Sequence, residues 1–412
     1  MALIGRDPWS GQLLRLEYAD GRVTAVHRES AVHRESAVHR ESAVHRESAA
    51  HRESAVHRES AEGGQITRSG GDADLPWISP GLVDLQVNGY GGFDLNGDDL
   101  SVDTVAGLRE TLRTVGVTTF VPTLVTANAE RISRAVAVVA EARRRHPEVA
   151  EAIPFIHLEG PHISDQDGPR GCHDATFVRP PDLAEFEQIQ QTAEGLIGLI
   201  TVSPHWPGST EFIAAVRATG TRVAIGHTHA DTAQIRAAVD AGATLSTHLG
   251  NGAHAQLPRH PNYLWAQLAD DRLTAGFIAD GHHLPVEAFV AMVRAKGLDH
   301  SFLVSDSVAI GGQPPGDYST TVGGDVELTD DGRLLVRGTP YLAGAAAPLS
   351  DGVSWAAAAF SLPEALTMAT TNPGRIVGGT VGQLCPGVPV SSVITFHWSH
   401  GDGHLSEISS GR

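Results

Sequence analysis

The run IPFIHLE at residues 153–159 is a short apolar stretch that stops at a carboxylate. Seven more runs of this form occur along the chain, two before it and five after it, and each ends at a polar or metal-binding residue. The full set covers residues 82–88, 117–123, 153–159, 196–203, 222–227, 243–248, 274–280 and 301–306. Strands of a parallel sheet are buried on both faces, so they form continuous apolar runs. Eight such strands predict a (β/α)8 barrel, in which functional side chains lie at the carboxyl ends of the strands.

Helical segments separate the predicted strands. Residues 101–116 have a polar start and a glycine stop, and residues 129–146 are amphipathic and end in a basic run, which suits a helix C-terminus. Asp231 is placed to cap a further helix, and residues 285–297 and 363–371 each begin with proline at an early helical position. Alternating strands and helices favour parallel βαβ units, so the predicted class is α/β with a TIM-like barrel.

Both chain ends are predicted to build a second, smaller domain. We assign residues 1–76 and 376–412 to the two halves of a small β-sandwich, and residues 77–375 to a metal-dependent barrel. Residues 26–61 are six copies of the hexapeptide VHRESA with one change, at Ala50. A six-residue period keeps no apolar face on a helix, and on a strand the valine face would also carry arginine and serine. We therefore expect a solvated, disordered insertion, with a histidine-rich metal-binding tract as the alternative.

Composition and charge exclude several classes of protein. The chain has 412 residues, enough for a barrel and a small domain, and its formal net charge of −18 argues against a nucleic-acid partner. Its two cysteines, Cys172 and Cys385, form no CxxC pair, so we expect no disulfide framework and a cytoplasmic location. The first residues lack the basic start and apolar core of a signal peptide, and no apolar stretch is long enough to span a bilayer.

Metal-binding side chains stand at the ends of several predicted strands. Glu159 ends the third strand, His248 ends the sixth, and His227 and His229 stand two residues apart at the end of the fifth. A carboxylate and two imidazoles can hold one divalent ion, so these strand ends predict a metal site. His227 and His229 share a face if the strand continues, so either is open as the ligand. A glutamate that caps the next segment, and histidines satisfied in the core, are the structural alternatives.

Three further polar residues lie at the ends of the first and eighth predicted strands. Asp306 ends the eighth strand, where a carboxylate is costly to bury without a partner or a function, so we interpret it as a catalytic base. A helix cap formed with Ser307 is the alternative. Gln86 and Asn88 end the first strand, and their amides can hold water or a polar substrate. The glycines that follow match no dinucleotide fingerprint, and the sequence has neither a P-loop nor a serine nucleophile elbow.

Seven motifs, in order along the chain, resemble those of the N-acetylglucosamine-6-phosphate deacetylases, a family of the amidohydrolase superfamily. They are PGLVDLQVNGYGG at residues 80–92, HLEGPHIS at 157–164, GHTHAD at 226–231, THLGNGAH at 247–254, ADGHH at 279–283, LVSDS at 303–307 and YLAGA at 341–345. The resemblance runs from about Pro80 to Gly378. Most amidohydrolases carry His-x-His on the first strand and hold a second metal there. This chain has Gln86 and Asn88 instead, as in the deacetylases that use one metal.

The resemblance implies a role for each matching residue. Glu159, His227 and His248 would ligate one divalent metal ion, with zinc as the first choice and iron, cobalt or manganese as alternatives. Asp306 would act as the base and then the acid, and His173 would contact the acetamide carbonyl. Substrate contacts are predicted for Gln86, Asn88, Cys172, Asn251, Gly252, Arg259, His283, Leu342, Ala343 and Gly344. The arginine among them would reach the sugar phosphate from a neighbouring subunit, which implies a homodimer.

The predicted activity is removal of the acetyl group from N-acetylglucosamine 6-phosphate, which gives glucosamine 6-phosphate and acetate. Departures from the family pattern lie around the phosphate pocket, where Gly252 replaces the usual alanine, and where His254 and residues 257–265 differ. The VHRESA insertion has no counterpart. Two alternatives stay open: a deacetylase of another N-acyl amino sugar or small N-acyl compound, and a non-catalytic barrel that only binds.

Overall fold

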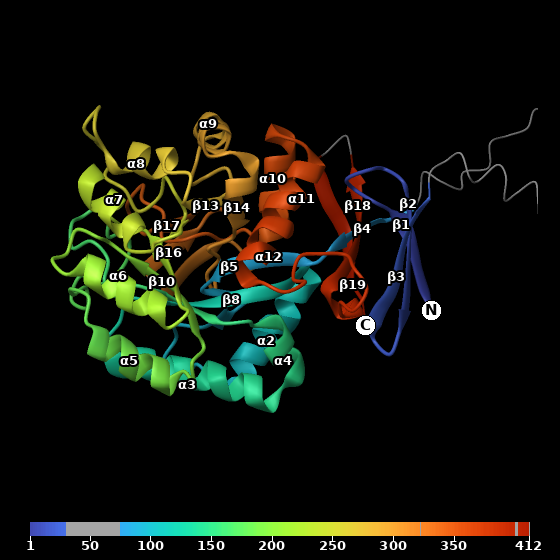
Figure 1. Cartoon of the computed structure of the whole chain (residues 1–412), viewed down its shortest axis with the longest axis horizontal. Coiled ribbons are helices and arrows are strands. Elements are labelled where there is room, and N and C mark those ends of the chain that lie inside the picture. Colours follow the sequence, from blue (N-terminus) through green and yellow to red (C-terminus); the bar gives the residue numbers. More distant parts are fainter. Residues whose placement is uncertain (30–74, 322, 400–402, 412) are drawn as a thin grey trace, which may run out of the picture.

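The computed structural model describes residues 1–29, 75–321, 323–399 and 403–411. Eight parallel strands form a nearly closed barrel in the order β14-β13-β12-β11-β10-β9-β8-β5, with helices around it (Figure 1). The strands are β5 (Leu82–Val87), β8 (Val117–Val125), β9 (Ile156–Glu159), β10 (Ile197–Val202), β11 (Arg222–Ile225), β12 (Leu245–Ser246), β13 (Thr274–Ile278) and β14 (Ser301–Val304). Each strand starts inside one of the eight apolar runs, so the predicted barrel is confirmed.

The first and last strands of the barrel meet at their carboxyl ends. The backbone N–H of Asp306 donates to the carbonyl of Gln86 at 3.0 Å, and the N–H of Asn88 donates to the carbonyl of Ser307 at 2.9 Å. These hydrogen bonds satisfy backbone groups that would otherwise be buried without partners. They also hold Gln86, in β5, and Asn88, directly after it, next to Asp306, which follows β14.

Two apolar layers stabilise the barrel. Buried side chains inside it are Val83, Leu85, Val121, Phe155, Leu199, Ala224, Leu245, Ile278, Phe302, Val304 and Ala345. A larger cluster, which includes Leu82, Phe120, Ile200 and Phe277, fills the space between strands and helices. Packed side chains therefore fill the interior of the barrel, as in other barrels of this type. The mouth of the barrel above them is polar.

Helices cover the outside of the barrel. They are α2 (Val102–Thr114), α3 (Ala129–Arg145), α4 (Pro147–Ala152), α5 (Leu183–Thr192), α6 (Ser209–Ala218), α7 (Thr232–Asp240), α8 (Tyr263–Ala269), α9 (Val286–Lys296), α10 (Leu349–Ala359), α11 (Leu362–Ala369) and α12 (Thr371–Val377). Ser101 caps α2 and Asp231 caps α7, each through a capping box, and the cap at Asp231 is the one predicted from the sequence. Among the described residues, no helix combines the length and apolar character needed to cross a bilayer.

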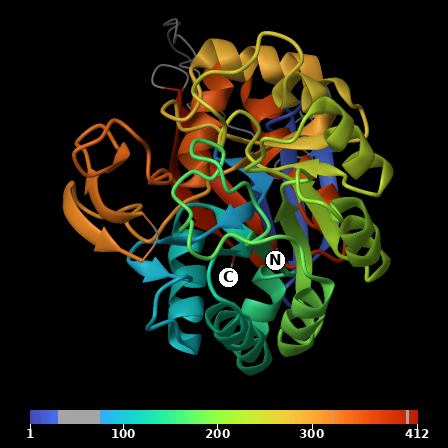
Figure 2. The same cartoon turned by 90° about the vertical axis from the view of Figure 1, so that its left-hand side faces the viewer.

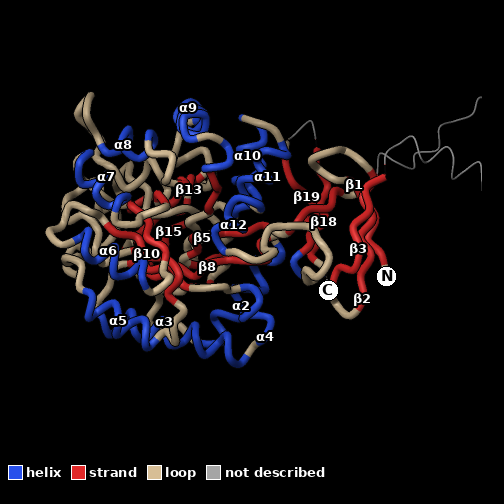
Figure 3. The backbone as a smooth tube through the Cα atoms, in the orientation of Figure 1, coloured by secondary structure: helices blue, strands red, loops and turns tan. Residues whose placement is uncertain are grey.

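Strands from both chain ends form one continuous mixed sheet at the end of the molecule where the two termini lie (Figures 1 and 3). Its strands, in spatial order, are β19 (His404–Ser410), β18 (Val393–Ser399), β4 (Trp77–Pro80), β1 (Ala2–Arg6), β2 (Leu13–Ala19) and β3 (Arg22–Glu29). β4 falls where we expected the barrel to begin, but it pairs with β1 and β18. The first four residues of the VHRESA segment extend β3, and the rest of that segment lies outside the described residues.

Two small sheets follow barrel strands and were not predicted. A hairpin of β6 (Gly89–Tyr90) and β7 (Phe93–Asp94) comes directly after β5. A three-stranded antiparallel sheet of β15 (Gly316–Thr320), β16 (Gly324–Leu328) and β17 (Leu334–Val336) follows β14 and projects from the side of the barrel, orange in Figure 2. It has its own small core, which packs against residues that follow Asp306.

Candidate metal centre and active site

Three side chains meet where β9, β11 and β12 end. Nε2 of His248 lies 3.0 Å from Oε1 of Glu159, Nε2 of His227 lies 3.3 Å from the same oxygen, and the two Nε2 atoms are 3.1 Å apart. All three side chains are buried. Donor atoms that share one tetrahedral zinc ion lie about 3.4 Å apart, so this triangle fits a single divalent cation.

The backbone turns sharply where these side chains enter the mouth. His227, His248 and Asp306 have φ angles of 45°, 25° and 50°. Residues other than glycine seldom adopt this left-handed region, and each such residue costs on the order of 1–3 kcal/mol. Strained residues concentrate at functional sites, because the surrounding structure must compensate for the cost.

Neighbouring groups orient the three side chains. Nε2 of Gln86 donates to Oε1 of Glu159 at 2.7 Å. Nδ1 of His227 donates to the carbonyl of Pro169 at 2.8 Å, which leaves its Nε2 with a lone pair for a cation. Burial alone would raise the pKa of Glu159, but hydrogen bonds and charge from His227 and His248 lower that pKa well below its usual value. The donor set is therefore a carboxylate and two imidazoles, all suited to a divalent ion.

Asp306 lies beside this triangle and is held by the side-chain amide of Asn88, which directly follows β5. Nδ2 of Asn88 donates to Oδ1 of Asp306 at 2.8 Å. Burial and the nearby Glu159 carboxylate raise the pKa of Asp306 to about 6. A carboxyl group with this pKa is mostly ionised at neutral pH yet can still take up a proton, which suits a general base.

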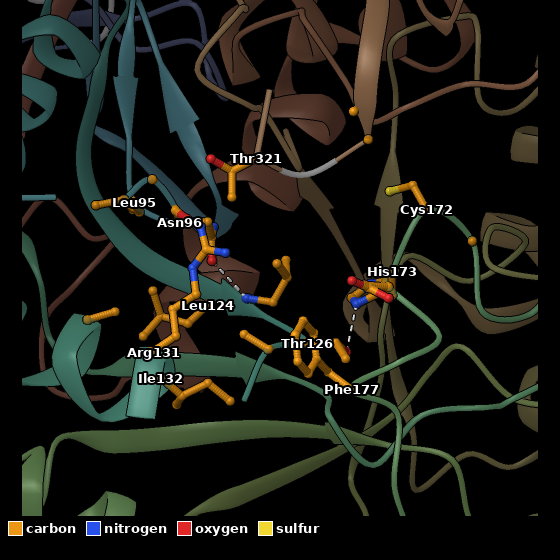
Figure 4. Close-up of a pocket in the computed structure, with 18 of the residues that line it drawn as sticks. Leu95, Asn96, Leu124, Thr126, Arg131, Ile132, Cys172, His173, Phe177 and Thr321 are labelled. Atoms are coloured by element: carbon orange, nitrogen blue, oxygen red, sulfur yellow. Dashed lines mark hydrogen bonds between the residues drawn. The ribbon is translucent and has the colours of Figure 1, made fainter. Parts of the chain in front are cut away.

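His173 and Cys172 come from the loop between β9 and α5. Nδ1 of His173 lies 2.9 Å from Oγ1 of Thr126 (Figure 4). Its Nε2 lies 3.9 Å from Oε2 of Glu159. Burial, together with the charge of His227, lowers the pKa of His173 to about 3, so the ring is neutral. Burial and nearby carboxylates raise the pKa of Cys172 to about 12, so its thiol keeps its proton.

A cavity of about 500 Å³ lies next to these two loop residues, at the end of β8 (Figure 4). His173, Cys172 and Thr126 line it, but Glu159, His227, His248 and Asp306 do not. Arg131, Arg134 and Arg170 also contribute to its wall. Carboxylates pair with all three guanidinium groups: Asp98 with Arg131 and Arg134, and Asp167 with Arg170.

His283 follows β13 and faces the same side of the barrel. Its Nδ1 lies 2.6 Å from Oδ2 of Asp280, and its backbone N–H donates to Oδ1 at 2.8 Å. Burial opposes ionisation of Asp280, but the hydrogen bonds and charge of His283 lower the pKa of Asp280 to about 2. The aspartate, which was not among the predicted site residues, therefore fixes the orientation of the imidazole.

The remaining predicted contact residues occupy two loops. In the loop after β12, Nδ2 of Asn251 is buried and has no hydrogen-bond partner among the described residues. Gly252 in the same loop has a φ of 55°, and Arg259 is exposed. A Cβ added at Gly252 would lie 2.7 Å from Nδ1 of His227, which explains the glycine. Residues 342–344 connect the β15–β17 sheet to the end of β14: Ala343 is buried in the core of that sheet, and Gly344 packs against Val308.

A buried carboxyl group beneath the site was not predicted from the sequence. Oδ1 of Asp84 accepts from the backbone N–H of Ser305 at 3.1 Å and from that of Gln86 at 3.3 Å. Burial raises the pKa of Asp84 to about 7. Its position inside the apolar run of β5 was the available signal, since an aspartate there needs partners.

The match to known proteins agrees with this site. Residues 77–395 match the model of the Amidohydrolase family, which is more than half of the chain. The chain therefore belongs to the amidohydrolase family. Within it, the chain is 34% identical over 320 residues to the N-acetylglucosamine-6-phosphate deacetylase of Bos taurus, covering 73% of this chain and 74% of that one.

One further sequence relative and one crystal structure are also similar to this chain. The N-acetylgalactosamine-6-phosphate deacetylase of Shewanella sp. (strain ANA-3) is 32% identical over 301 residues, covering 72% of this chain and 73% of that one. The crystal structure of N-acetyl-D-glucosamine-6-phosphate deacetylase from Mycobacterium smegmatis superposes with a TM-score of 0.79 at 27% identity, covering 100% and 98% of the two chains. The resemblance drawn from the seven motifs is thus confirmed at the level of the family.

Proposed function

We propose that this protein removes the acetyl group from N-acetylglucosamine 6-phosphate and releases glucosamine 6-phosphate and acetate. The observation that carries this proposal is the convergence of Glu159, His227 and His248 beside Asp306, at the carboxyl ends of four barrel strands. The proposal rests further on relatives that bear the names of hexosamine-phosphate deacetylases.

We infer that Glu159, His227 and His248 hold one divalent ion, with zinc as the first choice and iron, cobalt or manganese as alternatives. When bound, such an ion polarises a carbonyl group and lowers the pKa of water to about 7. The three donors suit it because two imidazoles and one carboxylate form the donor set of many hydrolytic centres.

Asp306 would carry the proton through the reaction. As a carboxylate, it accepts a proton from the attacking water, while Asn88 holds its Oδ1 in place. It then gives that proton to the nitrogen of the sugar, because an amide nitrogen cannot leave as an anion. Neutral His173 would donate a hydrogen bond to the oxygen of the acetyl group as negative charge develops there. The protonated thiol of Cys172 makes a covalent acyl-enzyme an unsuitable route.

The sugar and its phosphate would lie over the remaining predicted residues. Nδ2 of Asn251, which no described residue engages, offers a donor, and His283, Gly252 and the loop 342–344 lie around the same mouth. We propose that exposed Arg259 reaches the phosphate of a neighbouring subunit in a homodimer. Its guanidinium has the fork of donors that phosphate groups prefer.

A second candidate substrate is N-acetylgalactosamine 6-phosphate, because two of the relatives carry that name. Acetate release should be measured with both 6-phosphates and with unphosphorylated N-acetylglucosamine. We expect the highest kcat/KM for N-acetylglucosamine 6-phosphate and a large loss without the phosphate. A preference for the galactose epimer would overturn the substrate assignment, and equal rates without phosphate would overturn the phosphate pocket.

A further inference from the structure

A second group of metal-binding side chains lies at the barrel mouth. Asp165, His205 and His229 each present one ligand atom, and these atoms lie within 4.8 Å of one another. The three residues follow β9, β10 and β11 respectively, so they come from three successive loops. His229 is the histidine that the sequence left open as a partner of Glu159. It joins this group, whereas His227 joins Glu159 and His248.

His205 has a buried nitrogen that the described residues leave without a partner. The side chain is 10% exposed, and its Nε2 makes no hydrogen bond. Nδ1 lies 2.6 Å from Oγ of Ser203, which donates its own proton to Oγ1 of Thr228 at 2.7 Å. Ser203 must therefore accept from Nδ1–H, which puts the free lone pair of the neutral ring on Nε2. A buried lone pair without a donor is costly, and a cation would satisfy it.

The other two members complete a donor set around that lone pair. Oδ1 of Asp165 lies 3.8 Å from Nε2 of His205, and the imidazole of His229 packs against that of His205 with ring centroids 4.0 Å apart. Nδ1 of His229 lies 2.6 Å from Oγ of Ser164. Both histidines thus use Nδ1 for a serine hydroxyl, and outer hydrogen bonds of this kind commonly orient metal-binding histidines.

We propose that Asp165, His205 and His229 hold a second divalent cation of the zinc class, distinct from the ion at Glu159, His227 and His248. Donors to one zinc ion lie about 3.4 Å apart, and rotation of the exposed Asp165 side chain can close the present 3.8 Å. Water would complete the coordination, because the carboxylate is 59% exposed.

Such a cation would join three loops of the mouth. The loop after β9 carries Asp165 and, further on, Cys172 and His173. Linking it to the ends of β10 and β11 would restrict its motion while leaving the first centre unchanged. The expected role is therefore structural, and it concerns the loop that positions His173.

The test is the amount of zinc bound per full-length chain after equilibrium dialysis against zinc, measured by elemental analysis. The variant is Asp165→Asn/His229→Gln, which removes two ligands at partly exposed positions and opens no cavity. The control is His300→Ala, an exposed histidine before β14, at the opposite end of the barrel. All three proteins keep the histidines of the VHRESA segment, so only differences between them count.

Wild type and the control should bind one zinc more per chain than the double variant. Zinc should also raise the Tm of the double variant less than that of the wild type, because the ion binds only the folded state. Equal zinc content in all three proteins would overturn the proposal. Loss of two ions in the double variant would overturn it as well, because His229 would then belong to the first centre.

Discussion

At the scale of single residues, the side-chain amides of Gln86 in β5 and of Asn88 directly after it have different partners. Gln86 donates to Glu159, and Asn88 donates to Asp306. Gln86→Leu should therefore lower zinc affinity by about 10–100-fold, because it removes an outer partner of a ligand. Asn88→Leu should leave zinc affinity close to wild type and lower kcat. Zinc dissociation constants and acetate release of both variants test this crossed pattern, and identical effects in the two variants would contradict it.

Asp306→Asn should abolish proton transfer and keep the metal. We expect kcat to fall by about 10²–10⁴-fold, the usual contribution of a general acid–base group. Zinc content should stay at the wild-type level, because Asp306 is not among the three predicted ligands. A variant that loses zinc, or one that keeps wild-type turnover, would refute this role.

Site residues at strand ends could be predicted from the sequence, whereas contacts made by loop residues could not. Glu159 and His248 were predicted from strand ends alone. His227 and His229 could not be separated, because residues two apart share a face on a continuing strand. The structure separates them through φ of 45° at His227, which ends the strand geometry. The Asp165–His205 contact was missed, since loops decide it and no periodic pattern records loop conformation.

At the scale of elements, the cap of α7 is a local test of helix stability. Oδ1 of Asp231 accepts from the backbone N–H of Gln234 at 2.8 Å, and the glutamine side chain accepts from the N–H of Asp231 at 2.9 Å. Asp231→Ala should lower the free energy of unfolding by about 1 kcal/mol. Asp240→Ala, which breaks an exposed ion pair with Arg272, should change it by less than about 0.5 kcal/mol. Denaturant unfolding of both variants measures the difference, and equal losses would contradict the capping role.

Barrel strands were predictable because burial on both faces gives each of them an apolar run. The β15–β17 sheet was not, because segments such as GDYST and GDVEL are largely exposed and lack such runs. The barrel was expected to begin near Trp77, but that residue lies in β4 (Trp77–Pro80), outside the barrel sheet. β4 pairs with β1 and β18, and the local sequence carries no signal of such long-range pairing.

At the scale of the whole molecule, Asp84 should make stability depend on pH. Its pKa is about 7 in the folded state against an ordinary value of 3.8, so the folded protein keeps a proton that the unfolded chain loses. Stability should therefore fall as pH rises from about 4 to about 7. Relative to Asp84→Asn, the wild type should lose at most roughly 4 kcal/mol over that interval. Thermal unfolding of both proteins across this range tests the effect, and parallel curves would contradict it.

The central claim is that Glu159, His227 and His248 hold the ion on which hydrolysis depends. The direct measurement is acetate release from N-acetylglucosamine 6-phosphate by protein stripped with a chelator and then titrated with zinc. The matched proteins are wild type and Glu159→Gln, which removes the carboxylate shared by both histidines. We predict that stripping abolishes acetate release and that zinc restores it in the wild type but not in the variant. Undiminished release by the stripped protein, or full recovery by Glu159→Gln, would contradict the claim.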